Sequence, residues 1–357
     1  MKNIKILVIT GGISSEKELS LISGEDVIKA LLNEGKDVEV LEITNDKKMV
    51  LYSDSTSFLE RKKISDNKKN RNFDNLDFFM LQECGFDVAF LALHGNFGED
   101  GQVQTLLDLI NIPYTGSGMM ASSIGMNKSK CYEYISFYGI DVPEYFIVFR
   151  HNHSLEEIFS KIEKTIGFPC VIKPNDSGSS IGVTLPSSKD ELGVSLLEAF
   201  KYSLVVIVQK FIKGREFACG VLGNTNYSEL EVLPVVESLI KDSEIFTNFQ
   251  KYYANNIEEV CPAKIDVLLM KKIMKDSESV HKILGCDGLS RSDFRYSEED
   301  KKVYFLEINT SPGHTENSIC PQEARSLGMT FGEFVLKQIN LAFLKKESIE
   351  SSLIKNE

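Results

Sequence analysis

The 357-residue sequence lacks a surplus of positive charge. Its 40 Lys and Arg residues stand against 52 Asp and Glu, which gives a formal net charge of −12 at pH 7. Proteins that bind nucleic acids carry an excess of Lys and Arg along one face, so this balance argues against a nucleic-acid partner. Any phosphate that the protein binds must be held by a few local cations.

Long apolar runs and paired cysteines are also missing. No segment approaches the roughly 20 apolar residues that cross a bilayer, and the apolar run 4–9 is too short for the core of a signal peptide. The seven cysteines form no Cys-x-x-Cys pair and are odd in number, which is typical of reduced thiols. We therefore expect a cytoplasmic protein with no membrane partner.

Two common nucleotide-binding motifs are absent as well. Gly11-Gly12 lacks the G-x-G-x-x-G spacing that lets backbone approach a dinucleotide, so a dehydrogenase is a poor alternative. The Walker A order G-x-x-x-x-G-K-[ST] is not present either. A nucleotide site, if there is one, must be built in another way.

Alternating strands and helices organise the first part of the chain. Strands are expected at 4–9, 38–41 and 87–93 and a helix at 102–110, which together predict a parallel sheet. A further helix is expected to start where Ser15 and Glu18 form a capping box. The polar segment 61–75 is expected to be a solvated insertion loop.

The remainder of the chain predicts an α+β organisation with more than one core. Helices are expected near 127 and at 155–166 and 267–284, and strands at 145–149, 170–173, 217–222, 231–236, 290–296 and 302–309. The polar tail beyond Lys345 is expected to fray. The fold class is thus α/β and α+β.

The last two strands carry a cluster of polar residues. Side chains alternate along a strand, so Arg291 and Asp293 share one face, as do Glu307 and Asn309. A symmetric hairpin would place the Asp293 and Glu307 carboxylates opposite each other, where they repel unless a cation is bound, and oxygen ligands suit Mg²⁺. A solvated sheet face is the alternative. The turn-rich segment 310–315 that follows could offer backbone N–H groups to an anion, which favours a magnesium-nucleotide site.

A second cluster surrounds a loop rich in Gly and Ser. Residues 175–182 follow Lys173 and suit a flap over phosphates, and Lys173 and Lys128 supply local positive charge. The strand end at 209–212 could present backbone groups to adenine, and Glu216 could accept ribose hydroxyls.

In this order the motifs closely resemble the D-alanine:D-alanine ligases of the ATP-grasp superfamily, over nearly the whole chain. The similar segments are 11–16, 94–101, 113–118, the flap 175–182, Arg291-x-Asp293, Glu307-x-Asn309 and Ser318. The resemblance implies a three-domain ATP-grasp fold. An N-terminal Rossmann-like βα domain would span 1–116, a central ATP-grasp subdomain 117–211, and a C-terminal subdomain with lid and metal site 212–357.

The resemblance also implies a reaction. ATP would phosphorylate the carboxylate of one D-alanine, and the amine of a second would attack the acyl phosphate to give D-alanyl-D-alanine for peptidoglycan synthesis. ATP, Mg²⁺ or Mn²⁺, and D-alanine are the implied small molecules, and a homodimer is the implied assembly.

Site residues follow from the same resemblance. ATP contacts fall on Lys128, Lys173, Ser180, Gln209, Lys210, Ile212 and Glu216, and metal binding falls on Asp293, Glu307 and Asn309. Catalytic roles fall on Glu16, Ser179, Tyr252, Arg291 and Gly313, and substrate contacts on His94, Lys251 and Ser318. Lys251 and Tyr252 lie in an irregular segment, 244–260, which is expected to close as a lid over the acyl phosphate.

Several positions depart from the family pattern or leave alternatives open. Gln209 stands where glutamate is common, and its amide oxygen could still accept from the base's amino group. His314 replaces a usual methionine, with packing as its expected role, and the lid sequence 246–252 is unusual. Tyr252 argues against D-lactate as second substrate, whereas D-serine stays open. A third alternative is an inactive nucleotide-binding regulator. The sequence argues against it, because each position expected to bind metal or phosphate carries a suitable residue.

Overall fold

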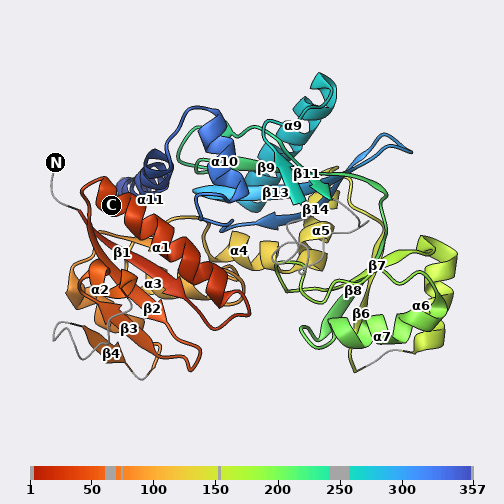
Figure 1. Cartoon of the computed structure of the whole chain (residues 1–357), viewed down its shortest axis with the longest axis horizontal. Helices are drawn as coiled ribbons and strands as arrows, with labels where there is room; N and C mark the ends of the chain where they lie inside the picture. Colours follow the sequence, from red (N-terminus) through yellow and green to blue (C-terminus); the bar gives the residue numbers. More distant parts are fainter. Residues whose placement is uncertain (1–3, 61–69, 74, 152–153, 241–256, 355–357) are drawn as a thin grey trace.

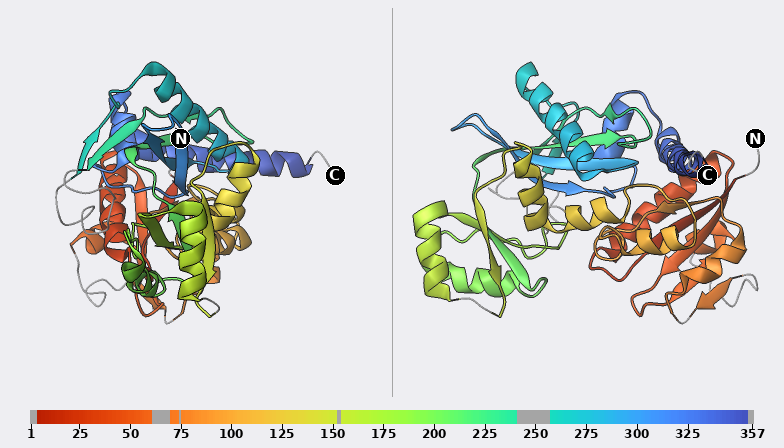
Figure 2. Two further views of the ribbon diagram at one scale, coloured as in Figure 1. Left: turned by 90° about the vertical axis from the view of Figure 1, so that its right-hand side faces the viewer. Right: turned by 180° about the vertical axis from the view of Figure 1, so that it is seen from behind.

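The computed structural model describes residues 4–60, 70–73, 75–151, 154–240 and 257–354. Their strands form three sheets of five, six and three strands. Each sheet belongs to a separate lobe, and the six-stranded sheet lies between the other two (Figures 1 and 2). None of the described helices is long and apolar enough to cross a membrane, and the seven cysteines are free thiols, as expected.

The N-terminal sheet has the order β4-β3-β2-β1-β5. Its strands are β1 (Lys5–Gly11), β2 (Asp37–Ile43), β3 (Met49–Tyr52), β4 (Arg71–Phe73) and β5 (Val88–Leu91). The expected parallel pairing is confirmed for β1, β2 and β5, but β3 and β4 add an antiparallel edge. The expectation of a loop over the whole of 61–75 was therefore wrong at β4, because a three-residue polar edge strand has no apolar alternation to reveal it.

Both faces of this sheet are covered. Ile6 and Val8 point to one face, where α1 (Lys17–Asn33) and α11 (Phe331–Ile354) pack. Leu7 and Ile9 point to the other, where α3 (Gln102–Leu109) packs. A helix from the end of the chain thus completes the first core (Figure 1).

Two local expectations in this lobe were wrong. The tail beyond Lys345 continues α11 to Ile354, and Lys345 is held by an ion pair to Asp287 at 2.8 Å. Ser15 makes no capping box, because α1 starts after Glu16 with no side-chain cap. Instead the Glu16 N–H donates to Ser14 Oγ at 3.1 Å, which fixes the backbone of Glu16 as the helix begins.

The three-stranded sheet is antiparallel with the order β6-β8-β7. It consists of β6 (Tyr145–Phe149), β7 (Cys170–Pro174) and β8 (Val205–Lys210), with α6 (Leu155–Lys161) and α7 (Lys189–Ala199) on its core. The helix expected at 155–166 changes at its end into a π-helical turn, η3 (Ile162–Ile166). The strand expected directly after the flap is not formed: among the described residues 183–188 there is only a bridge between Thr184 and Ile172.

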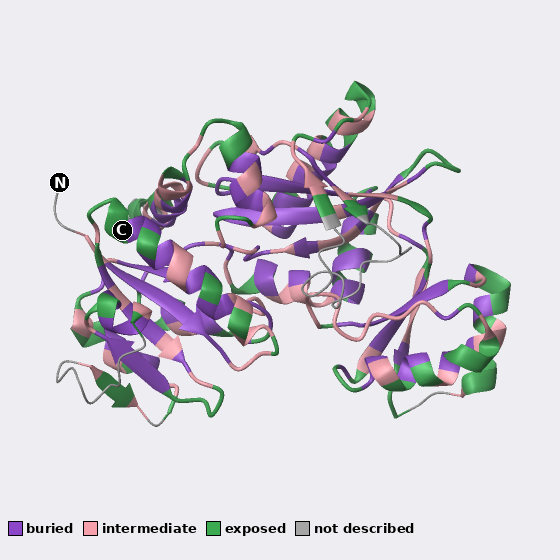
Figure 3. Ribbon diagram, viewed as in Figure 1, coloured by how far each residue is buried: buried purple, intermediate pink, exposed green. Residues whose placement is uncertain are grey.

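The central sheet has the order β12-β11-β9-β13-β14, and β10 also pairs with β9. Its strands are β9 (Gly214–Leu222), β10 (Glu231–Val232), β11 (Val236–Ile240), β12 (Ile257–Val260), β13 (Leu289–Ser297) and β14 (Val303–Asn309). The single strand expected at 231–236 is interrupted, because Pro234 has no N–H for the ladder. The sheet's strands are largely buried (Figure 3).

Helices pack around this sheet and position the site. They are α4 (Met119–Met126), α5 (Lys128–Phe137), α9 (Val267–Leu284), as expected, and α10 (Ile319–Ser326). Two shorter segments, α2 (Ser55–Leu59) and η2 (Phe78–Cys84), belong to the first lobe. α5 begins at Lys128, where the side chain of Asn127 accepts the Lys130 N–H, so this helix start directs a cation toward the hairpin.

Candidate functional site

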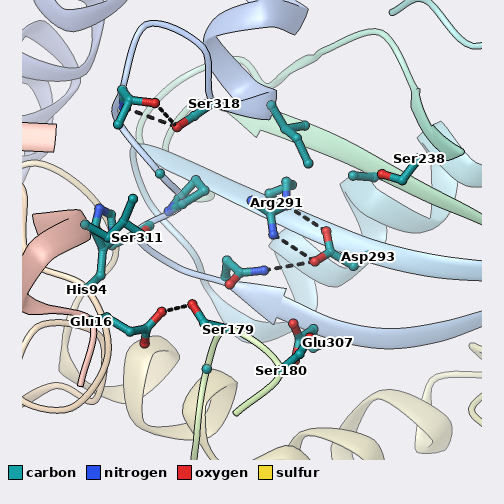
Figure 4. A pocket seen from close by; sticks show the side chains of 18 of the residues that line it. Glu16, His94, Ser179, Ser180, Ser238, Arg291, Asp293, Glu307, Ser311 and Ser318 are labelled. Atoms are coloured by element: carbon teal, nitrogen blue, oxygen red, sulfur yellow. Dashed lines mark hydrogen bonds and ion pairs between the residues drawn. The ribbon is translucent and has the colours of Figure 1, made fainter. Parts of the chain in front are cut away.

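A cavity of about 380 Å³ lies between the N-terminal lobe, the flap and the central sheet (Figure 4). The predicted residues that line it are Glu16, His94, Ser179, Ser180, Glu216, Arg291, Asp293, Glu307, Asn309, Gly313 and Ser318. A second cavity of about 110 Å³ is lined by Lys128, Lys173, Ser180, Gln209, Ile212, Glu216, Asp293 and Glu307. Four residues are common to both, so the two cavities adjoin at the hairpin.

The hairpin has the register that the alternation predicted. Arg291 lies opposite Asn309 and Asp293 opposite Glu307, with an irregularity only after Asp293. Strands β13 and β14 therefore bring all four side chains to one wall of the cavity.

Protein cations neutralise both carboxylates of this wall. Arg291 Nε and Nη2 donate to the two oxygens of Asp293 at 2.7 and 2.8 Å, and Lys128 Nζ lies 3.2 Å from Glu307 Oε2. Burial opposes the charge on Arg291, but the adjacent Asp293 carboxylate outweighs it and raises the pKa of the guanidinium. Each of the two opposed carboxylates is thus paired with a protein cation, which the alternation of side chains along the strands could not predict.

The donor chemistry of the wall still suits a hard metal ion. Asn309 Nδ2 donates to Asp293 Oδ2 at 3.2 Å, which leaves the amide oxygen of Asn309 as a third oxygen donor. Oxygen-only sets of this kind are what Mg²⁺ takes. In the described part of the chain, no cluster of three or more His, Cys, Asp or Glu could hold a metal, so an amide donor is needed to complete this set.

Glu16 projects into the opposite side of the cavity in a tight enclosure. Ser179 Oγ donates to Glu16 Oε1 (Figure 4). A Cβ atom on Gly95 would lie 2.6 Å from Glu16 Oε2, and one on Gly178 would lie 2.7 Å from it. A side chain at either position would therefore displace this carboxylate. The flap approaches closely because Ser179 adopts a left-handed φ of 52°.

Glu99 is a cavity residue to which the sequence analysis gave no role. Its Oε2 accepts the Gly95 N–H at 2.6 Å, and its side chain lines the same cavity as Glu16. Burial, and next the Glu16 carboxylate, raise the pKa of Glu99 to about 8. Its position within the 94–101 motif was the one feature of the sequence that could have indicated Glu99 as a site residue.

Two histidines are buried near the cavity, and one of them, His94, lines it. His94 is buried, with Nδ1 3.2 Å from the Ser311 carbonyl oxygen and Nε2 2.9 Å from Ser23 Oγ. His314 Nε2 lies 3.0 Å from Gln338 Oε1, and its ring packs edge-on against Phe90. Burial lowers the pKa of His314 to about 4. His314 is therefore neutral near pH 7, in keeping with the expected packing role.

The turn after β14 closes the far end of the cavity. Ser318 Oγ accepts the Thr315 N–H at 3.2 Å and lies 2.7 Å from Thr315 Oγ1. A Cβ atom on Gly313 would lie 2.7 Å from Ser318 Oγ. The absence of a side chain at Gly313 leaves its backbone and Ser318 together on the cavity surface.

The smaller cavity holds most of the predicted nucleotide residues. Burial and the nearby Lys128 lower the pKa of Lys173 to about 8. Arg295, which the sequence analysis missed, donates to Glu216 Oε2 at 2.8 Å and to the Ile212 carbonyl at 3.3 Å. Lys210 is exposed and lies outside the cavity lining, and its N–H donates to the Glu144 carbonyl at 2.8 Å.

Two predicted residues, Lys251 and Tyr252, lie outside the described residues. The expectation that 244–260 lacks regular structure was wrong at its end, since β12 (Ile257–Val260) pairs with β11. Ser238 and Glu259 are partners in that pairing, and both line the larger cavity.

Sequence comparisons agree with this geometry. The family description "D-ala D-ala ligase N-terminus" matches residues 5–117, and "D-ala D-ala ligase C-terminus" matches residues 134–340. The chain belongs to the D-alanine–D-alanine ligase family. Similar proteins include the D-alanine–D-alanine ligase of Geobacter sulfurreducens, 35% identical over 97% of this chain and 96% of that protein. The ligase of Geotalea uraniireducens is 33% identical over 97% of each chain.

Solved structures of ligases have the same fold. The VanG D-Ala:D-Ser ligase of Enterococcus faecalis is 31% identical, with a TM-score of 0.80 over 96% of this chain and 100% of that chain. The D-alanine–D-alanine ligase of Coxiella burnetii is 23% identical, with a TM-score of 0.82 over 99% and 98% of the two chains. These matches confirm the expected ATP-grasp fold and the small-molecule ligase class, a family that implies ATP and Mg²⁺.

Proposed function

We propose that this enzyme uses ATP to join two molecules of D-alanine, giving the D-alanyl-D-alanine that peptidoglycan synthesis consumes. One observation carries the proposal beyond family membership. The register of β13 and β14 places Arg291, Asp293 and Glu307 in the cavity that also holds Glu16 and Ser179. A phosphate-binding wall and an ammonium-binding carboxylate thus face one space.

The nucleotide and metal sites in this proposal use the smaller cavity and the hairpin. Of the residues that bind ATP, Lys128, Lys173, Ser180, Gln209, Ile212 and Glu216 line the smaller cavity and Lys210 lies outside its lining. Asp293, Glu307 and Asn309 hold Mg²⁺ or Mn²⁺. When bound, the ion neutralises charge on the transferring phosphate. Lys128 lies between Glu307 and the flap, with Nζ 2.6 Å from the Ser177 carbonyl oxygen. Its ammonium can therefore contact phosphates that bind beneath the flap.

In the first half-reaction, a carboxylate oxygen of the first D-alanine attacks the γ-phosphorus of ATP. The bond from that phosphorus to the ADP oxygen breaks, and an acyl phosphate forms. Glu16 binds the ammonium of this substrate, and His94 lies beside it. The surroundings of Glu16 support this role, because Gly95 and Gly178 leave room for its carboxylate and Ser179 donates to it.

In the second half-reaction, the amine of the second D-alanine attacks the acyl carbon. The carbonyl oxygen becomes an oxyanion, which Arg291 and the Gly313 N–H stabilise, and phosphate then leaves as the peptide bond forms. Arg291 uses only two of its five N–H donors on Asp293, so others remain for the oxyanion. Lys251 and Ser318 bind the second carboxylate, and Ser179 and Tyr252 complete a network with Glu16 near the amine.

D-serine is the second candidate for the second substrate. The favouring observation is that the VanG D-Ala:D-Ser ligase of Enterococcus faecalis is 31% identical to this chain. Ser238 and Glu259 add polar groups to the cavity that holds Ser318. Specificity between the two amino acids therefore depends on this end of the cavity.

Mass spectrometry of the products tests the proposal directly. The enzyme is supplied with ATP, Mg²⁺ and pairs from a panel of D-alanine, D-serine and D-lactate, and ADP release is measured in parallel. We expect D-alanyl-D-alanine to form fastest, with one ADP per dipeptide. Faster formation of a mixed product would overturn the D-alanine preference, and absence of ADP release would support the inactive nucleotide-binding regulator.

The broader organisation belongs to the same proposal. We place domain limits at 1–116, 117–211 and 212–357, with α11 reaching back to the first lobe. Consumption of ATP and seven free thiols favour a cytoplasmic location. A homodimer is the proposed assembly, and light scattering of the purified protein would test it.

A further inference from the structure

Tyr132 occupies a buried position behind the nucleotide cavity. This residue of α5 is fully buried, and its hydroxyl oxygen meets three groups from separate strands. It lies 2.6 Å from the Leu306 carbonyl oxygen, 2.9 Å from Lys173 Nζ and 3.1 Å from the side-chain amide of Gln209, at Oε1. Leu306, Lys173 and Gln209 all line the smaller cavity, whereas Tyr132 does not. Tyr132 therefore acts on that cavity only through its neighbours.

The Tyr132 hydroxyl has one proton and two lone pairs, which determines whether each partner donates or accepts. A phenol has one proton to donate, and a backbone carbonyl can only accept. The shortest of the three contacts runs to the Leu306 carbonyl, so the proton belongs there. A Lys173 ammonium can only donate, and it uses one lone pair of the hydroxyl. The remaining contact, to Gln209, has no proton from Tyr132 left to use.

The Gln209 amide satisfies this contact when its NH₂ group faces Tyr132. The oxygen and nitrogen of a carboxamide occupy equivalent positions, and their assignment follows from the surrounding network. With nitrogen toward Tyr132, the carbonyl oxygen of Gln209 points the other way. Within the described residues, that second amide position makes no hydrogen bond, and Gln209 lines the cavity. The oxygen is thus presented to whatever the cavity binds.

We propose that Tyr132 is a positioning residue for nucleotide-base selection: it turns the Gln209 carboxamide so that its oxygen faces the base and selects a purine with an amino group at C6. Adenine carries this donor at C6, whereas hypoxanthine and guanine carry an oxygen acceptor there. Two acceptors facing each other leave a buried hydrogen bond unmade, which disfavours the wrong base. The inference rests on the proposed nucleotide site and adds a source for its base selectivity.

Glutamine suits position 209 because the Tyr132 hydroxyl has no proton to give to it. A carboxylate has no proton to donate. Beside a hydroxyl whose proton is already given to Leu306, a glutamate would place two acceptors 3.1 Å apart. Glutamine removes that conflict and keeps an acceptor toward the base. Tyr132 and Gln209 therefore form a matched pair, although they lie 77 residues apart in the sequence.

A comparison of ATP with inosine triphosphate tests the proposal, because the two nucleotides differ in the group at C6. Binding of each Mg²⁺-nucleotide to the whole enzyme is measured by calorimetry without amino acids, and kcat/KM is measured with D-alanine. Wild type should prefer ATP by about 100-fold. In Tyr132→Phe, which keeps the ring but frees Gln209 to turn, the ATP to inosine triphosphate ratio should fall about tenfold or more.

Matched variants separate selection from general damage. Tyr145→Phe removes a hydroxyl that donates to the Ser129 carbonyl at 3.3 Å, from a ring that contacts Tyr132, and it should leave the ratio unchanged. Gln209→Met removes the amide with Tyr132 in place and should lose the preference to the same degree. The double variant should show no further loss.

The outcomes are distinct. Equal weakening of both nucleotides in Tyr132→Phe would overturn the proposal, since it would show a purely structural role, and so would an unchanged ratio in Gln209→Met. Gln209→Met also decides the matter if Tyr132→Phe does not fold. Failure of wild type to bind either nucleotide would instead reject the proposed function.

Discussion

Asp293 and Glu307 are direct partners across β13 and β14, yet each carboxylate is paired with a cation from a different direction. Arg291, two residues along the same strand, binds Asp293, and Lys128, at the start of a distant helix, meets Glu307. The hairpin thus holds its charges in balance without substrates. In the proposed function, a phosphate and a metal ion that bind at this wall would exchange these partners for new ones.

Glu307→Gln should reduce ligase activity on the order of 100-fold and raise the Mg²⁺ concentration needed for half-maximal rate. The amide keeps the shape of the side chain but loses the charge that attracts both the ion and Lys128. A magnesium titration of the initial rate measures the effect. Glu298→Gln, which changes an exposed carboxylate at the tip of the same hairpin, should behave as wild type. An unchanged magnesium requirement in Glu307→Gln would exclude this residue as a ligand.

Gly95→Ala should raise the KM of the first D-alanine about tenfold, because the added Cβ displaces the Glu16 carboxylate. The loss of stability caused by a side chain at a positive φ can be measured separately, at Gly85. Gly85 has nearly the same φ, +69° against +71°, but nothing within 4 Å of an added Cβ. Both alanine variants should lose about 1–2 kcal/mol of folding stability, and only Gly95→Ala should change KM. Similar kinetics for the two variants would show that Glu16 does not depend on the enclosure.

The pH dependence of ATP use should report Lys173. Burial and Lys128 lower its pKa to about 8 in the nucleotide-free protein, so the charged ammonium prevails below pH 8 and the neutral amine above it. The kcat/KM for ATP should therefore fall about fivefold between pH 8 and pH 9, because the charged fraction of a group with a pKa of about 8 drops from one half to about one tenth over that unit. Lys173→Arg stays protonated, and its profile should be flat over this range. A slope of equal size in that variant would assign the titration to another group.

Ser318→Ala should chiefly weaken the second substrate. Its hydroxyl is held at the cavity by Thr315, at the end remote from Glu16 (Figure 4). Initial rates fitted with a separate KM for each D-alanine should show an increase of about tenfold in the KM of the second molecule and little change in that of the first. Ser326→Ala, at the other end of α10, serves as the control. Equal effects on both KM values would contradict this division.

Local periodicity predicted the part of the site in which neighbours in sequence are neighbours in space. Alternation along two strands was enough to place Arg291, Asp293, Glu307 and Asn309 on one face, because a hairpin turn fixes the register. It could not show that Lys128 reaches Glu307, since that contact depends on how α5 packs under the sheet. The need for local positive charge and the family resemblance both indicated Lys128, but neither indicated its partner.

The residues that were missed share one property. Glu99, Tyr132 and Arg295 act through contacts with chain segments that are distant in sequence or through the shape of the cavity. Taken alone, Tyr132 in a helix and Arg295 in a strand look like ordinary core and surface residues. The edge strands β3 and β4 were missed for a related reason, because pairing with neighbouring strands stabilises them more than their own pattern does.

The packing of α11 on the first sheet has a consequence for synthesis on the ribosome. α11 follows every other described element in the chain, yet Val335, Ile339 and Ala342 cover the same core as Val27 and Val8. The lobe that is translated first therefore has α1 but not α11 on this face until the last helix emerges. Its core is complete only when the two later lobes have been made, so nascent chains expose the part of this apolar face that α11 covers for most of translation.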